Sequence, residues 1–144
     1  MNHVYIIIAL VISFLWGIQP IIHKELLKDF SSPTLMFLTG FAYLLCLSIF
    51  SYMNKETLLK EFNAINTKNI IMILFVSIIT VFIVNIVYFK VLKNHEASIV
   101  SALIYTSPVF TLMVAHLLTH EELSKYGFIG IILITIGTMC VSAN

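Results

Sequence analysis

The stretch "VYIIIALVISFLWGIQPII", from Val4 to Ile22, decides the fold. It holds no charged residue, and it is about as long as the 20 or so helical residues that cross a hydrocarbon core of about 30 Å. The whole chain has the same character, with 60% hydrophobic and 10% charged residues. In soluble domains roughly half of the residues are hydrophobic and about a quarter are charged. The sequence therefore predicts an integral membrane protein.

Four further apolar stretches meet the same test, and the charged residues lie between them. We predict an all-α integral membrane protein, a five-transmembrane-helix bundle forming one domain over residues 1–144. The first stretch has no Lys or Arg before it and no small-x-small cleavage site, so we expect it to be a retained span. The longest connection, residues 54–68, has the pattern of an amphipathic piece on the membrane surface. The expected spans are 4–22, 33–53, 69–89, 97–118 and 126–142.

The charges restrict the partners of the chain. All eight basic residues are Lys and seven acids almost balance them, so no basic face exists to bind nucleic acid. An N-terminus in the cytoplasm would place four lysines on each side of the membrane, so the loops give no positive-inside bias. Either another feature such as the N-terminal amine sets orientation, or copies insert both ways and pair antiparallel. With the N-terminus in the cytoplasm, the cytoplasmic lysines would be Lys55, Lys60, Lys68 and Lys125. Those on the other side would be Lys24, Lys28, Lys90 and Lys93.

A family pattern is present near the C-terminal end, in "SPVFTLMVAHLLTHEELSKYGFIGIILITIG", residues 107–137. The chain resembles the EamA-type unit of the drug/metabolite transporter superfamily. In that unit a helix with a Pro-hydrophobic step precedes a short loop with Glu and a Leu-Ser pair, and a helix with two spaced glycines follows. The matching residues here are Pro108, Val109, Glu121, Leu123, Ser124, Gly130 and Gly137. The "WG" of Trp16 and Gly17, followed by Lys24, fits the first helix of the family.

The resemblance implies that the chain is one half of a ten-helix inverted-repeat transporter. It implies a multi-pass protein of the cell's inner or plasma membrane that moves a small-molecule substrate by alternating access, as an exporter, exchanger or facilitator. A second unit would complete the transporter, either as a homodimer, parallel or antiparallel, or as a second half-size subunit. The alternative function is a non-transporting membrane subunit that partners or regulates another membrane protein.

Polar and aromatic side chains inside the spans are the candidate substrate-binding residues. An amide in lipid must find a partner, so Gln19 and Asn85 are expected to face the bundle interior. The alternative is that such residues only join helices together. An uncharged lining of this kind favours neutral, zwitterionic or aromatic solutes over phosphates. The predicted substrate-binding residues are Trp16, Gln19, Asn85, Tyr88, Tyr105 and Ser107.

Prolines and glycines are predicted to shape the helices. Pro20 and Pro108 each remove a backbone donor, so each is expected to kink its helix, either at a gate or for structural reasons only. Gly17 is predicted to let a neighbouring helix approach at this gate. Gly130 and Gly137 lie two turns apart on one face of the fifth span and are predicted helix-packing residues.

The sequence favours no other chemistry. The "HLLTHEE" segment places His116 and His120 four residues apart beside Glu121, but a third ligand would have to come from elsewhere, so we expect no metal and no cofactor. No nucleophile set, phosphate loop or pair of acids indicates an enzyme. No carboxylate lies in mid-span, so we predict a facilitator, an exchanger or coupling through another group.

Overall fold

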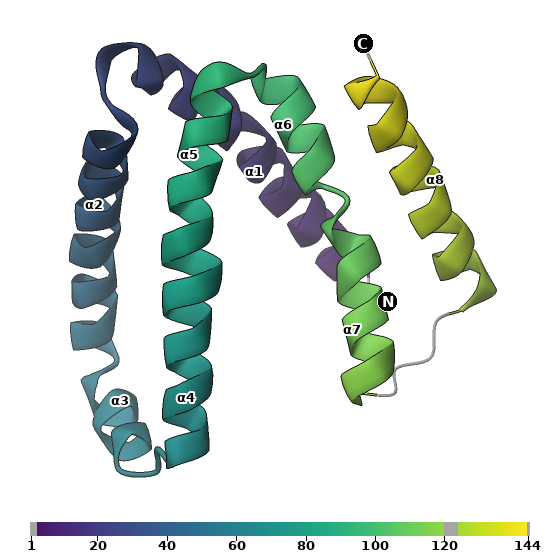
Figure 1. Cartoon of the computed structure of the whole chain (residues 1–144). Coiled ribbons are helices and arrows are strands. Elements are labelled where there is room, and N and C mark those ends of the chain that lie inside the picture. Colours follow the sequence, from purple (N-terminus) through teal and green to yellow (C-terminus); the bar gives the residue numbers. More distant parts are fainter. Residues whose placement is uncertain (1–2, 120–123, 144) are drawn as a thin grey trace. The chain divides into compact units, whose positions relative to one another are not determined.

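The computed structural model describes residues 3–119 and 124–143, and every regular element among them is helical (Figure 1). Five of its helical segments are long and apolar enough to cross a membrane. The prediction of an all-α protein with five candidate spans is therefore confirmed for this part of the chain. These segments are His3–Asp29, Ser32–Met53, Thr67–Asn94, Ala97–Leu117 and Lys125–Ser142.

The contacts divide the chain into two compact units, residues 23–94 and residues 1–22 with 95–144. The division falls inside α1 (His3–Asp29), two residues after Pro20. The single domain over residues 1–144 stays a prediction.

The unit of residues 23–94 contains the last turns of α1 and a long helical hairpin. α2 (Ser32–Met53) begins at the N-cap Ser31, whose hydroxyl accepts a hydrogen bond from the Thr34 backbone N–H. Short α3 (Lys55–Phe62) follows, and then a segment made of α4 (Thr67–Phe75), the π-helix η1 (Val76–Ile83) and α5 (Val84–Asn94). α2 packs along α5 (Figure 1).

The C-terminal end of α5 organises this unit. The Lys24 ammonium of α1 donates hydrogen bonds to the backbone carbonyls of Leu92 and Lys93, each at 2.8 Å. The last carbonyls of a helix have no partner within it, and they attract cations. The Ser32 hydroxyl of α2 approaches the Phe89 carbonyl at 3.5 Å. Four of the buried apolar residues surround these contacts: Leu27, Leu35, Phe89 and Leu92.

The other unit contains the first part of α1 and the last two spans. α6 (Ala97–Ile104) and α7 (Ser107–Thr119) together make the fourth span, and α8 (Lys125–Ser142) packs against both. α8 begins at Ser124, whose hydroxyl accepts a hydrogen bond from the Gly127 N–H at 3.1 Å. Val100 of α6 and Pro20 of α1 are the buried residues of this unit among those described.

Replacing Lys24 tests the role of its two carbonyl contacts. Hydrogen bonds to charged groups contribute about 1.5 to 3 kcal/mol, and partial exposure lowers that, so we expect Lys24→Gln to cost about 1 kcal/mol of unfolding free energy. Unfolding in mixed detergent micelles, followed by circular dichroism, measures the change. Lys28→Gln is the matched control, because the contact of Lys28 with the described residues is an exposed ion pair with Glu25, one turn away. Equal losses in the two variants would contradict this role.

Candidate functional site

Four of the predicted substrate-binding residues lie in the unit of residues 1–22 and 95–144. Trp16 and Gln19 are exposed on α1, and Trp16 has 61% of its surface accessible. Tyr105 follows the end of α6, and Ser107 begins α7. Within the described part of the chain, no hydrogen bond or ring contact joins the first pair to the second. The structure therefore does not bring the two residues of α1 into contact with the two of the fourth span.

The fourth span is interrupted at Tyr105 and Thr106, between α6 and α7. Pro108 has no N–H and its ring crowds the carbonyl four residues earlier, which is that of Ile104, the last residue of α6. The Thr106 hydroxyl donates to the Leu103 carbonyl at 2.7 Å and so satisfies part of the interrupted backbone. Pro108 itself occupies the first turn of α7, where proline is well tolerated. The candidates Tyr105, Ser107 and Pro108 therefore do not lie on one continuous helix.

Pro20 does not interrupt its helix, because α1 continues through it. Pro20 is buried and leaves the Trp16 carbonyl without its usual helical donor. Gly17 lies one residue after that carbonyl, and a methyl group added at Gly17 would meet no atom within 4 Å. This turn of α1 therefore lacks one of the usual helical hydrogen bonds and has open space at Gly17.

The other two predicted substrate-binding residues, Asn85 and Tyr88, lie half-buried on α5 in the unit of residues 23–94. The Asn85 amide donates to the Val81 carbonyl at 2.7 Å, so it bonds to its own helix. Tyr88 packs edge-to-face with the His23 ring at 6.2 Å, and His23 lies 4.9 Å from the Phe89 ring. The structure thus places Tyr88 in a small aromatic cluster with α1.

Two features of this unit were not predicted. One is the cluster that His23 forms with Phe89. The only sign of this cluster in the sequence is that both residues are aromatic. The His23 Nδ1 atom is buried and has no hydrogen-bond partner among the described residues. The other is η1, which runs through the middle of the third span. Its sequence "VSIITVFI" contains no Gly or Pro and reads as any apolar helix, so it gives no signal for a π-helix.

The predicted packing glycines show no close neighbour. A Cβ added at Gly130 or Gly137 would meet no atom within 4 Å, although α8 packs against α6 and α7. Their role in packing stays a prediction.

The metal-binding alternative rests partly on residues outside those described. His120, Glu121 and Glu122 lie there, as does Leu123 of the family pattern. In the described ranges, no three His, Cys, Asp or Glu side chains group in a way that could hold a metal ion.

Comparison with known proteins gives one match, to the EamA-like transporter family, over residues 3–143. The chain belongs to the EamA-like transporter family. No curated protein and no solved structure matches it. Membership confirms the predicted resemblance, and with the five apolar helices it identifies a multi-pass membrane protein. EamA-like proteins are transporters, which supports the expectation that the chain is not an enzyme and acts on small solutes.

Gly17 and Gly40 offer a matched test of the first span in this EamA-like unit. Both are helical, and an added methyl group meets no atom within 4 Å at either. Because Ala is favoured over Gly in helices, Gly17→Ala and Gly40→Ala are each expected to stabilise the protein by about 0.5 to 1 kcal/mol. Only Gly17→Ala should slow transport, by restricting the turn beside Pro20. Detergent unfolding and liposome flux measure the two effects. Unchanged flux in Gly17→Ala would exclude a gating role.

Proposed function

We propose that the chain transports a small neutral, zwitterionic or aromatic solute by alternating access, as a dimer of five-span units. The observation that carries this proposal is the EamA-like family match over residues 3–143. The predicted residues Trp16, Gln19, Asn85, Tyr88, Tyr105 and Ser107 would bind the solute.

The polar groups of the spans support a solute-binding role. Gln19 lies inside the first candidate span, is exposed, and makes no hydrogen bond to any described residue. An amide in hydrocarbon must find a partner, so Gln19 requires one from outside the described chain. Cavity water, the solute or a second subunit can each supply it.

The hydrogen bonding of the Asn85 side chain also supports a solute-binding role. Its amide N–H donates within its own helix at 2.7 Å, and it makes no hydrogen bond to another of the described helices. One further N–H and the carbonyl oxygen remain for a ligand, because a carboxamide has two donors and one acceptor atom. Asn85 therefore combines a fixed position on α5 with free hydrogen-bonding capacity.

The irregular backbone also supports transport. The third span contains η1 and the fourth is interrupted at Tyr105 and Thr106. Non-helical backbone at membrane depth is tolerated where protein or a water-filled cavity covers it, and transporters place such breaks beside their substrates. Pro108 and Pro20 are the proposed sites of bending during the transport cycle.

Asn85→Ala is the principal test of the solute site. We expect solute flux into liposomes containing the purified chain to fall at least about tenfold, the effect of losing about 1.4 kcal/mol of binding. Stability should change little, because even hydrogen bonds between membrane helices contribute only about 0.6 kcal/mol on average. Trp16→Ala should reduce flux in the same assay.

Asn94→Ala is the matched control. Its amide makes the same kind of bond, to the Lys90 carbonyl four residues earlier at 2.9 Å, on the same helix. Flux should be unchanged in this variant. A chain that carries no solute in any assay, but binds another membrane protein, would instead support the regulatory subunit.

The antiparallel form of the dimer can be tested by topology. Reporters fused to the C-terminus, active on opposite sides of the membrane, should both give signal if copies insert in both orientations. Glu25→Lys and Glu56→Lys add positive charge to loops on opposite sides, so they should shift the distribution in opposite directions. A single orientation in the parent chain would exclude the antiparallel dimer and leave a parallel dimer or a second subunit.

A further inference from the structure

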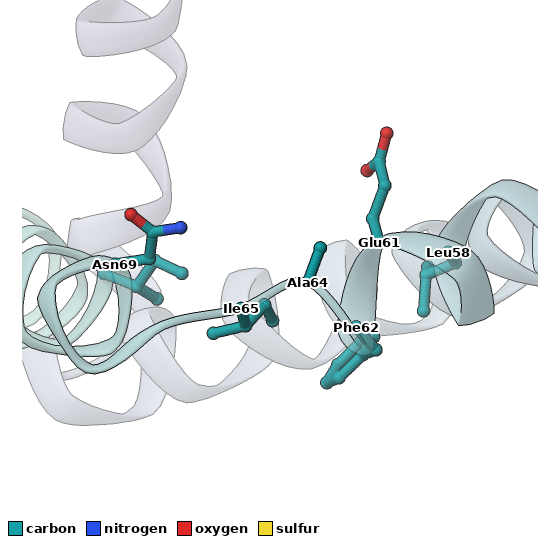
Figure 2. Close-up of a pocket in the computed structure, with 7 residues that line it drawn as sticks. Leu58, Glu61, Phe62, Ala64, Ile65 and Asn69 are labelled. Carbon is teal, nitrogen blue, oxygen red and sulfur yellow. The ribbon is translucent and has the colours of Figure 1, made fainter.

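The turn between the second and third spans forms a surface hollow of about 410 Å³ (Figure 2). α2 ends at Met53 and α4 begins at Thr67, so this turn lies at one face of the membrane. Most of the lining is apolar, and Glu61 and Asn69 provide its polar side chains. The lining residues are Leu58, Glu61, Phe62, Ala64, Ile65, Asn69 and Ile73.

The apolar side chains of α3 gather on one side. Leu58 and Phe62 are four residues apart and so share a helix face. Figure 2 shows the Phe62 ring and the Glu61 carboxylate projecting to opposite sides of the chain. Leu59 and Phe62 have 65% and 64% of their surface accessible. A short helix at a membrane face with large exposed apolar groups is suited to the boundary between headgroups and acyl chains.

The charges of the same turn favour an anionic partner. Lys55, Lys60 and Lys68 outnumber Glu56 and Glu61. Lys55 lies 5.7 Å from the centre of the Tyr52 ring, and within the described residues Lys60 and Lys68 form no ion pair. The Asn69 side-chain amide makes no hydrogen bond among those residues and can donate one. A cluster of lysines beside a span is attracted to anionic lipid.

We propose that this turn binds an anionic phospholipid, with part of an acyl chain in the hollow and the phosphate near Lys60, Lys68 and Asn69. The apolar lining of Leu58, Phe62 and Ile65 suits a hydrocarbon chain, and the two lysines neutralise the phosphate. Glu61 opposes binding by repelling the phosphate. The proposal is independent of which solute the protein transports.

Tryptophan quenching by lipids brominated on the acyl chains tests the proposal on the full chain. Trp16 is the single tryptophan of the sequence, so Trp16→Phe with Phe62→Trp places one fluorophore at the hollow. In vesicles, brominated phosphatidylglycerol should quench it more strongly than brominated phosphatidylcholine at equal mole fraction. Each lysine should contribute about a fivefold preference at low salt, which weakens as salt is added.

Charge variants on this background give effects of opposite sign. Lys60→Gln with Lys68→Gln should abolish most of the preference for phosphatidylglycerol, whereas Glu61→Gln should increase it. Lys90→Gln with Lys93→Gln is the matched control, because it removes the same charge from exposed positions at the end of α5. This control should keep the parental preference. Circular dichroism and gel filtration confirm that each variant is folded.

Three results would overturn the proposal. Equal quenching by the two lipids in the parent chain would show that the turn does not select anionic lipid. An unchanged preference in Lys60→Gln with Lys68→Gln would place the selectivity elsewhere. Absence of quenching by either lipid would show that protein, such as a second copy of the chain, covers the hollow.

Discussion

The ammonium of Lys24 on the last carbonyls of α5 is the contact on which the unit of residues 23–94 depends. A helix that ends near a membrane face must satisfy its terminal carbonyls, and a cation from a neighbouring helix does so without a large protein core. The same end of α5 supplies Phe89 and Leu92 to the buried cluster and a carbonyl to Ser32. Three polar contacts and a few apolar ones thus connect α1, α2 and α5. The solute-site candidates Asn85 and Tyr88 lie on α5, two turns or less before this junction.

Polar side chains elsewhere in the spans bond mainly to their own helices. The hydroxyls of Ser48, Thr80 and Thr135 each donate to the carbonyl four residues earlier. This local bonding removes the cost of a hydroxyl in hydrocarbon but adds little attraction between helices. Helix association must then come from packing, and the described chain has few buried side chains. Further apolar contacts with another five-span unit would add the packing that the chain by itself lacks.

Hydropathy was enough to predict the spans, because length and the absence of charge located five segments. The N-caps Ser31, Asn66 and Ser124, whose side-chain oxygens accept backbone N–H groups, were not predicted. The Lys24 contact could not be predicted, because its acceptors lie 68 and 69 residues away and are backbone atoms. The π-helix could not be predicted either, because its residues differ in no type from those of an α-helix. The candidate site residues could be chosen as the polar and aromatic residues inside the spans. The sequence does not determine which of them contact one another.

The irregular backbone of the third span and that of the fourth span differ in their relation to proline, and this difference bears on the roles of the two spans. The break before Pro108 follows from covalent structure, since proline has no N–H to bond to the Ile104 carbonyl and its ring crowds that carbonyl. Proline alone does not force a break, because α1 continues through Pro20. η1 has no Pro or Gly, so no residue type in it prevents an α-helix. π-helical turns are rare and occur frequently at functional sites. The C-cap Val84 N–H reaches the carbonyl of Ile79, five residues back, immediately before Asn85. A change of η1 to α-helix would rotate Asn85 and Tyr88 relative to the first half of the span. The third span therefore places the solute-site candidates immediately after a π-helix, whereas the interruption of the fourth span lies beside a proline.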